Sequence, residues 1–468
     1  MRSFRHAKAE ITRQVADFIT GLNYEDLGSD LVQRAKLSIL DGLAVAVAGS
    51  VRPGSGIVRD YASGFSSSGP QGTVIGSKLK IPPRFAALCN GTSMHADDWD
   101  DVYHAADDRH LGFHSTAAVL PAILASAETS RISGRELLVA YLAGIEVGCK
   151  IFDATDPSHV LEGLHSLGTC GPIGAAAGVA KICGLSREQV LTSLGIAASH
   201  SGGLRENFGT HMKSYHAGRA AECGLLSVEL CQRGLTAAAN ILEAKRGFFR
   251  ALGGTGSLDR FDGRLGNPWS IVDRGFNLKP WPSGGLSHAA ITKMLELVEQ
   301  ADLQAGSVKE IRIETSQSVY NTLLQHSPES ALEARFSLEF CVAAPVVAGT
   351  LDASHFSDEF VRRPDVRQMM GKVRYNTFSQ EKAREIDASL TTALIDVELT
   401  TGETIWTRAD YGKGSPQLPQ TFDDIAAKME TAAGLAGRPP ASCRPVIEIV
   451  GDLERLDDVR SLMERLKW

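Results

Sequence analysis

The hydrophobic pattern from residue 10 to about residue 265 has a helical period. Within residues 30–48, apolar side chains recur at steps of three and four, which places them on one face of a helix: Leu31, Ala35, Ile39, Leu43 and Ala46. Gly49 follows this run as an expected stop. The pattern predicts one helix after another through this part of the chain.

Local signals mark where further helices begin and end. Ser133 with Glu136, and Ser186 with Gln189, have the spacing of a capping box, in which each side chain bonds the other residue's backbone N–H. Apolar helical sequence follows both pairs. Gly184 stands where a glycine with left-handed backbone would close the helix before it.

The pattern changes near residue 265, after which a Pro-, Trp- and Gly-rich stretch resembles a crossover. Apolar residues then alternate in residues 308–314 and 393–399, as they do in half-buried strands. The second of these segments turns at 401–403 into residues 404–408, which predicts a hairpin. Residues beyond Thr421 are helical in pattern again.

These patterns predict a mainly α protein with a large all-helical domain and a smaller α+β domain. Two domains are also the expectation for a chain of 468 residues. The helical tail is expected to return to the first domain, so that the smaller domain is an insertion. We place the all-helical domain at residues 1–268 and 415–468, and the α+β domain at 269–414.

Composition narrows the class of protein. Hydrophobic residues make up 43% and charged residues 22%, which is ordinary for a globular protein. The net charge of −7 gives no electrostatic footprint for nucleic acid or for an anionic membrane. No apolar run reaches transmembrane length, and the polar N-terminus does not resemble a signal peptide. None of the 8 cysteines forms a CxxC pair, so we expect free thiols and a cytoplasmic location.

The segment from His95 to His114 carries the densest chemistry, with four histidines and six aspartates in HADDWDDVYHAADDRHLGFH. Apolar sequence flanks it on both sides. It is interpreted either as a solvated acidic loop or as the polar wall of a pocket, anchored between two core helices. Such a charge density requires partners if it is buried.

A metal-dependent alternative comes from Asp97–Asp101, which matches the DDxxD pattern with which isoprenoid synthases hold Mg²⁺ on a diphosphate. A second acidic motif should accompany it, and the sequence has none at the proper distance. The histidines also lack the i, i+4 pair backed by a glutamate that is typical of zinc sites. We therefore predict no metal and no cofactor.

Two further segments offer proton-transfer groups. His165 precedes the glycine-rich stretch up to Gly174, which opens an Ala-rich helix whose N–H groups attract carboxylates. Lys213 lies between Phe208 and Tyr215 and is predicted to point into a pocket, where partial desolvation suits it to pair with a carboxylate. A lone histidine or lysine is more often structural, and that interpretation stays open for both.

The segment KPWPSGGLSH, residues 279–288, is rich in Pro and Gly. Ser283 and the two glycines after it expose backbone N–H groups that could form an anion nest. A plain interdomain linker is the equally favoured alternative.

These segments, in this order, resemble the MmgE/PrpD family, which includes 2-methylcitrate dehydratase, cis-aconitate decarboxylase and iminodisuccinate epimerase. The resemblance runs the length of the chain. It is carried by an ordered set of motifs: Val32–Lys36 with Asp41–Ala44, Asn90-Gly91 with His95, His114 with Ala118–Pro121, Gly163–Leu185, Asn207–Thr210 with Lys213, His216–Gly218, Lys279–Ser283 with His288, and Ala334–Ser337 with Glu339–Cys341.

The resemblance implies a helical domain with an α+β lid, an active site between them, a homodimer and a small polycarboxylate substrate. The catalytic residues that it implies are Asp98, His114, His165 and Lys213. Val102 and Phe340 stand where the family carries threonine and tyrosine, so each position loses a hydroxyl. The segment before His114 is longer than usual and adds Arg109 and His110. The expected substrate-binding residues are His95, Arg109, Arg205, Ser283, His288 and Phe340.

The family's reactions imply a cofactor-independent lyase that makes or breaks a bond beside a carboxylate. In this hypothesis Lys213 and an arginine hold carboxylates, His165 or His114 moves a proton, and Asp98 orients a histidine. Elimination of water, as in 2-methylcitrate dehydratase, is the leading expectation. Epimerisation or decarboxylation by the same residues, and a family member that only binds a ligand, are the alternatives.

Overall fold

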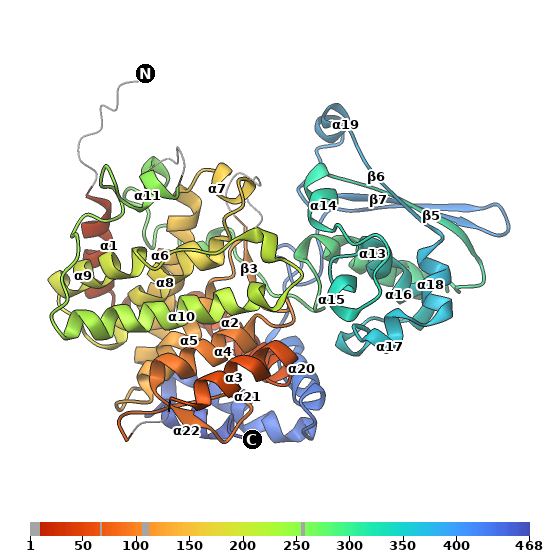
Figure 1. The fold of residues 1–468 in the computed structure, drawn as a ribbon. Coiled ribbons are helices and arrows are strands. Elements are labelled where there is room, and N and C mark those ends of the chain that lie inside the picture. The colour runs from red at the N-terminus through yellow and green to blue at the C-terminus, as the bar shows by residue number, and fades with distance from the viewer. Residues whose placement is uncertain (1–9, 66–67, 105–111, 254–257) are drawn as a thin grey trace. The chain divides into compact units, whose positions relative to one another are not determined.

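The computed structural model describes residues 10–65, 68–104, 112–253 and 258–468. The chain divides into two compact units (Figure 1). Unit 1 comprises residues 1–276 and 421–468, and unit 2 comprises residues 277–420. The boundaries expected from the sequence were 268/269 and 414/415. Within the described residues, no helix is both long and apolar enough to cross a membrane.

Unit 1 is built from helices, together with strands of two residues each. Its longer helices are α1 (Ile11–Gly21), α2 (Ser29–Gly49), α3 (Pro53–Ser63), α4 (Pro83–Met94), α5 (Ser115–Ala127), α6 (Gly134–Ala154), α8 (Ser166–Ile182), α9 (Arg187–Ala198), α10 (His211–Gln232), α20 (Phe422–Leu435) and α21 (Arg444–Gly451). Short helices are α7 (Ser158–Leu161), α11 (Phe248–Ala251), α12 (Ser270–Asp273) and α22 (Arg460–Arg465). The strands are β1 (Gly72–Thr73), β2 (Lys80–Ile81), β3 (Val102–Tyr103) and β4 (Phe276–Asn277).

The helix signals in the sequence are confirmed. The run predicted at 30–48 is α2, with Gly49 as its last residue. Both capping boxes form, at the starts of α6 and α9, with the serine side chain accepting from the third residue of each helix. Gly184 has a φ of +61°, the left-handed conformation expected one residue beyond the cap of α8.

The centre of unit 1 consists of α4, α5, α6, α8 and α10, and small residues let these helices pack backbone to backbone. A Cβ atom on Gly218 of α10 would lie 2.1 Å from the Leu88 carbonyl oxygen of α4. One on Gly174 of α8 would lie 3.0 Å from the Gly144 carbonyl oxygen of α6. These contacts require glycine and fix the positions of the helix ends that carry the candidate site.

Helix α20, from the returning C-terminal segment, packs against α2 in unit 1. Its Lys428 is buried, pairs with Asp41 of α2 at 2.6 Å, and donates to the backbone carbonyl of Trp99 at 2.8 Å. The Lys428 ammonium also lies 4.7 Å from the Trp99 ring centre. The C-terminal segment is therefore bonded to the aspartate-rich loop at Trp99.

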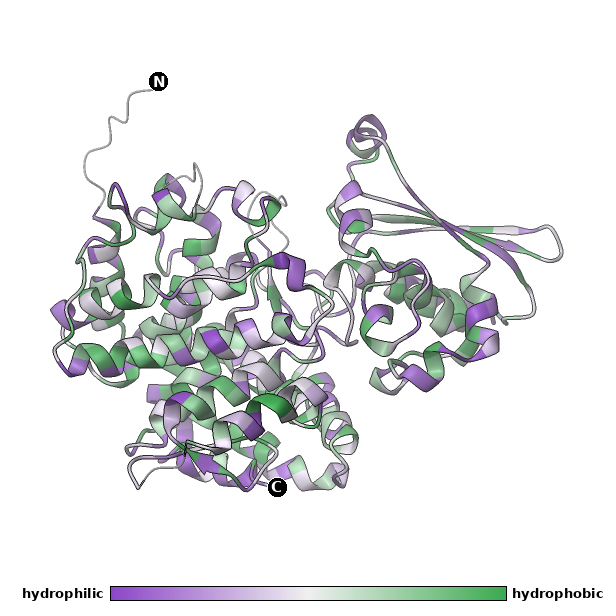
Figure 2. Cartoon of the chain, viewed as in Figure 1, coloured by the Kyte–Doolittle hydropathy of each residue, from purple (hydrophilic) through white to green (hydrophobic). Residues whose placement is uncertain are grey.

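Unit 2 is the α+β part of the chain. Its helices are α13 (His288–Gln300), α14 (Gln317–Thr322), α15 (Ala331–Ala334), α16 (Leu338–Ala348), α17 (Asp358–Val361), α18 (Pro364–Met370) and α19 (Gln380–Glu385). Its strands are β5 (Val308–Thr315), β6 (Val373–Thr377), β7 (Ala393–Leu399) and β8 (Thr404–Ala409). In Figure 2, hydrophobic residues dominate α13 and α16, which contribute most of the buried helical residues of the unit's core.

The four strands form one sheet in the order β6-β5-β7-β8. The predicted strands β5, β7 and β8 are confirmed, including the β7–β8 hairpin, in which Val397 pairs with Ile405. The strand β6 was not predicted; it pairs parallel to β5, with Ile311 opposite Val373. A parallel pairing over this sequence distance leaves no local turn signal. The predicted fold class, a large helical domain with a smaller α+β domain, is confirmed.

Candidate functional site

Four helix ends in unit 1 bring the candidate residues together. His95 follows the last residue of α4, and His114 precedes the first residue of α5. His165 precedes α8, and Lys213 lies in the first turn of α10. The starts of α5, α8 and α10 carry partial positive charge, which favours bound anions. The arrangement therefore suits a carboxylate ligand before any side-chain charge is considered.

Lys213 is buried, as the sequence predicted from its apolar neighbours. Its ammonium lies 2.7 Å from an Asp98 carboxylate oxygen and 3.0 Å from Nε2 of His95. The Phe208 ring centre is 5.4 Å away. Asp98 itself has a φ of +50°, in the left-handed region that non-glycine residues seldom adopt, and such strain is common at functional sites.

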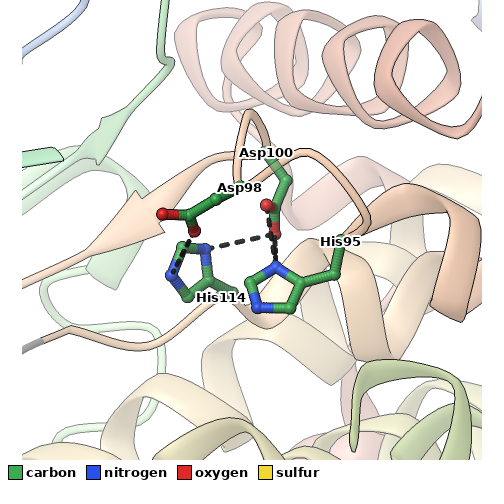
Figure 3. Close-up of side chains that lie close together, drawn as sticks. All are labelled: His95, Asp98, Asp100 and His114. Carbon is green, nitrogen blue, oxygen red and sulfur yellow. Dashed lines mark hydrogen bonds and ion pairs between the residues drawn. The ribbon is translucent and has the colours of Figure 1, made fainter. Parts of the chain in front are cut away.

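Asp100 holds two imidazole rings, as Figure 3 shows. Its carboxylate lies 2.8 Å from Nδ1 of His95 and 3.1 Å from Nδ1 of His114. Burial acts to raise the pKa of Asp100, but the two histidines outweigh it and hold that pKa well below its usual value. Asp100 is therefore a buried carboxylate anion that orients both rings.

The hydrogen-bonding partners of His95 determine which of its ring nitrogens carries the proton. Burial lowers the pKa of His95 to about 4 despite the attraction of Asp100, so the ring is neutral near pH 7. The carboxylate of Asp100 can only accept, so Nδ1 of His95 donates to it. Nε2 then carries the lone pair and accepts from the Lys213 ammonium.

His114 has the same tautomer in its neutral form for a similar reason. Its Nδ1 lies 2.7 Å from the backbone carbonyl oxygen of Asp101, which can only accept a hydrogen bond. The neutral ring therefore presents the lone pair of Nε2, which lies 4.0 Å from an Asp98 oxygen (Figure 3). Nε2 of His114 is placed to take up a proton in the cluster.

His165 also lies near His95, with ring centres 6.1 Å apart. Phe208 packs edge-on against it at 4.9 Å. Burial, with added repulsion from Lys213 and the neighbouring histidines, lowers the pKa of His165 well below its usual value. Its Nδ1 lies 2.9 Å from Nδ1 of His216 on α10.

The described part of the acidic segment is not a solvated loop, because Asp97, Asp98, Asp100 and Asp101 are all buried. Each has its own partner: Asp97 pairs with Arg52 at 2.8 Å, and Asp101 accepts a short hydrogen bond from Thr116. Burial raises the pKa of Asp101 well above its usual value. The DDxxD carboxylates therefore already have separate partners in the fold, which argues against the isoprenoid-synthase alternative.

A metal ion would find four donors in this cluster. The ligand atoms of His95, Asp98, Asp100 and His114 lie within 4.8 Å of one another. The Lys213 ammonium, however, already supplies a cation to two of these groups, Asp98 and His95. A metal at the same point would require that ammonium to move away.

Dialysis against a chelator is therefore expected to leave turnover unchanged, because the lysine ammonium supplies the local positive charge. Initial rates before and after EDTA treatment, with total metal measured by mass spectrometry, test this prediction. A loss of rate that zinc or magnesium restores would contradict it. Lys213→Met treated in the same way is the matched control, since removal of the ammonium opens the cluster to a metal.

Stability is expected to depend on pH through His95. The neutral ring of the folded chain titrates near pH 4, whereas the unfolded ring titrates near 6.5, so the unfolded chain binds the proton first as the pH falls. The contribution of His95 is complete above about pH 6.5 and is lost between 6.5 and 4, amounting to roughly 3 kcal/mol.

Urea unfolding of the protein and of His95→Asn across this pH range measures that contribution. The free-energy difference between the two should fall as the pH drops, whereas His211→Asn should follow the unchanged protein. Parallel pH curves for the protein and His95→Asn would contradict the prediction.

The other predicted substrate-binding residues lie in different places. Arg205 is close to the cluster: its guanidinium is 5.5 Å from the Phe208 ring centre and donates to the Val160 carbonyl at 2.8 Å. Its Nε is buried and has no hydrogen-bond partner among the described residues. Arg109 and His110 lie outside the described residues.

Three predicted residues belong to unit 2. Ser283 is buried and lies 3.1 Å from Nε2 of His288. Phe340 is buried in the core of the unit, with its ring centre 5.4 Å from that of Phe356. Their role toward the cluster in unit 1 stays a prediction.

Sequence reasoning missed two members of the cluster. Asp100 was one of several similar aspartates, and nothing local distinguished it from Asp97 or Asp101. His216 was noted only as part of a motif. Its spacing of three residues from Lys213 places both on one face of a helix, and this signal was available in the sequence.

The chain is similar to proteins named cis-aconitate decarboxylase and 2-methylcitrate dehydratase. Cis-aconitate decarboxylase of Mus musculus is 28% identical over 477 residues, covering 98% of this chain and 93% of that protein. The Homo sapiens protein of the same name is 29% identical, covering 98% and 94%. A 2-methylcitrate dehydratase of Escherichia coli (strain K12) is 22% identical over 78% of each chain.

Family models match both parts of the chain. The MmgE/PrpD N-terminal domain matches residues 13–260, and the MmgE/PrpD C-terminal domain matches residues 281–448. Together with the ordered motifs and the helical architecture, these matches identify the chain as a member of the MmgE/PrpD family.

Proposed function

We propose that this protein is a lyase that removes carbon dioxide from a small unsaturated tricarboxylate of the cis-aconitate type. One observation carries the proposal: the buried ammonium of Lys213 lies beside the imidazole of His95, and Lys213, His114 and His165 lie at the starts of three helices. The decarboxylases that align with 98% of the chain support the choice of reaction.

The chemistry requires a cation beside the reacting carboxylates. When the carbon–carbon bond to the departing CO₂ breaks, the electron pair stays on the substrate and its charge spreads toward a neighbouring carboxylate. A fixed ammonium in a dry site stabilises that charge more than water does. Lys213 is the residue in this role, and Asp98 and His95 hold its ammonium in place.

The carbon that keeps the electron pair then takes up a proton. Nε2 of His114 and Nε2 of His165 are the candidate positions, because Nδ1 of each ring is already hydrogen-bonded. The pKa of His165 lies well below its usual value, so this ring, once protonated, releases its proton readily to a carbanion. His114 and His165, whose ring centres lie 4.6 Å and 6.1 Å from that of His95, give the reaction two candidate proton-transfer groups.

Binding of a substrate with several carboxylates needs further positive charge. The N-termini of α5, α8 and α10 supply it through their backbone N–H groups. Arg205, next to Phe208, is the arginine assigned to this role, and its Nε has no hydrogen-bond partner among the described residues. The predicted roles of Arg109, Ser283, His288 and Phe340 belong to the same proposal.

Dehydration of a 2-methylcitrate-type hydroxy acid is the second candidate. It is favoured by the aligned dehydratase and by Val102, a buried apolar residue on β3 where the sequence resemblance implies a threonine. In this reaction a histidine removes the proton beside a carboxylate, and a second acid protonates the departing hydroxyl. The same Lys213 ammonium stabilises the intermediate charge.

Proton NMR of the purified protein with cis-aconitate, 2-methylcitrate, citrate and iminodisuccinate tests the proposal. Decarboxylation gives a product with one carbon fewer and released CO₂, whereas dehydration gives an unsaturated acid without CO₂. Deuterium uptake from D₂O without net conversion would indicate epimerisation. Binding without any conversion would overturn the enzyme assignment, and Lys213→Met is the matched negative control.

Two expectations from the sequence form part of this proposal. We expect a homodimer, which light scattering at several protein concentrations would measure. We also expect a cytoplasmic location, where the thiols of the 8 cysteines stay reduced.

A further inference from the structure

His216 is a buried histidine with no role in the mechanism above. It lies one helical turn after Lys213 on α10, and its side chain faces His165 at the start of α8. The two Nδ1 atoms are 2.9 Å apart, and both residues are buried, with 4% of His165 and 7% of His216 exposed. Among the described residues, His165 is the hydrogen-bonding partner of the His216 ring.

A contact between two Nδ1 atoms at this distance needs one proton between them. Two lone pairs would repel each other, and two N–H groups would clash. The two neutral rings must therefore hold opposite tautomers: one has its proton on Nδ1 and the other on Nε2. The tautomer of His165, and hence what its Nε2 offers a substrate, is tied to the state of His216.

Contacts with neighbouring residues hold the two histidine rings in position. The backbone N–H of His165 donates to the Gly203 carbonyl at 3.0 Å, and a Cβ atom on Gly203 would lie 3.4 Å from the His216 ring. Close packing of Gly218 against Leu88 fixes α10 two residues beyond His216. These contacts fix the backbone that carries both rings, so the pairing is a built feature of the fold.

We infer that His216 is a positioning residue that sets the tautomer of His165 and exchanges a proton with it during turnover. This inference rests on the proposed function, because it needs His165 to exchange a proton with the substrate. In this arrangement His165 faces the cluster, and His216 supplies a second imidazole that is hydrogen-bonded to His165.

The protons balance in both directions. When Nε2 of His165 takes a proton from the substrate, the carbon keeps the electron pair, and the Nδ1 proton of His165 passes to Nδ1 of His216. The positive charge then lies on His216. For proton delivery, the pair first takes up one proton from solvent, so that His216 is an imidazolium. Nε2–H of His165 then goes to the carbanion while Nδ1 of His165 takes the proton from His216, and both rings end neutral. One proton lies between the two Nδ1 atoms at every stage.

The burial of both rings supports this arrangement. Desolvation lowers the pKa of each ring, with Lys213 as the next cause in both cases. His95 and His114 are the other titratable groups that act on His165. The pair is therefore neutral at rest and carries a positive charge only in passing.

Two substitutions separate positioning from proton exchange. His216→Ala removes both and is expected to lower kcat by about 10–100-fold, with KM nearly unchanged. In His216→Asn the side-chain amide reaches the position of Nδ1, so it orients His165 without taking its proton. We expect His216→Asn to recover part of the lost kcat. His211→Ala, on the same helix and exposed, is the matched control with unchanged kcat.

A measurement without substrate tests the pairing by itself. In protein labelled with ¹⁵N-histidine, the shifts of Nδ1 and Nε2 report the tautomer of His165, assigned with His165→Gln. We expect a single tautomer in the unchanged protein and in His211→Ala, and a mixture in His216→Ala. An unchanged tautomer or an unchanged kcat in His216→Ala would overturn the inference. If no polycarboxylate is turned over, the proposed function fails while the tautomer result still stands or falls separately.

Discussion

Replacing Lys213 with methionine is expected to lower kcat/KM by about 10²–10³-fold, the usual cost of removing one group that stabilises developing charge. The methionine side chain keeps the length and apolar contacts of the lysine stem, including those with Phe208. It loses the ammonium that lies 2.7 Å from Asp98 and 3.0 Å from His95. The substrate then meets the carboxylate of Asp98 where it previously met the Lys213 ammonium.

Initial rates with the substrate found by NMR measure this effect, and thermal unfolding shows whether the variant is folded. Lys213→Arg keeps the charge but spreads it over a planar fork that does not reproduce the contacts of an ammonium, so only partial activity is expected. Lys181→Met on α8 removes a lysine that donates to a backbone carbonyl, at 3.4 Å, and should keep full activity. Near-normal turnover of Lys213→Met would refute the role assigned to this residue.

Lys428→Met is expected to destabilise unit 1 by about 3–5 kcal/mol, because the buried carboxylate of Asp41 then loses its ion-pair partner. Asp41 is fully buried and lies 2.6 Å from the lysine ammonium. The same ammonium holds the carbonyl and the ring of Trp99. Trp99 stands between Asp98 and Asp100, so we also expect the variant to lose activity.

Urea unfolding followed by circular dichroism measures the loss, and a double variant identifies its cause. Lys428→Met combined with Asp41→Leu removes both charges and should recover much of the stability, since an apolar pair avoids the desolvation penalty. Lys467→Met breaks an ion pair with Glu464 at the surface and should change little. Equal losses in the single and the double variant would show that the buried charge is not the cause.

Several features of the fold were predictable because their causes are local. The capping boxes at Ser133 and Ser186 need only residues three positions apart, and Gly184 needs only its own backbone freedom. The β7–β8 hairpin follows from alternation on both sides of a short turn. The strand β6 was not predictable in this way, because its partner β5 lies about sixty residues earlier in the chain.

The aspartates near His95 show where local reasoning stops. Asp97, Asp98, Asp100 and Asp101 look alike in sequence, yet the fold gives them different partners: Arg52, Lys213, two histidines and Thr116. Burial and the different partners then give these aspartates different pKa values. The pKa of Asp100 falls well below the usual value, while that of Asp101 rises well above it. Arg52 and Lys213 are far from their aspartates in the chain, whereas the partners of Asp100 and Asp101 lie within about 15 residues and are brought close only by the fold of the loop.

The sequence by itself determined the helical and α+β composition, the family, and the segments that carry His114, His165 and Lys213, because periodicity and motif spacing are properties of neighbouring residues. Only the tertiary structure decided that Asp100 orients two rings, that Lys428 of the returning segment holds the loop at Trp99, and that His216 pairs with His165. Each of these contacts joins residues from different helices or loops. Their burial in the folded chain determines which nitrogen carries a proton and which carboxylate is charged.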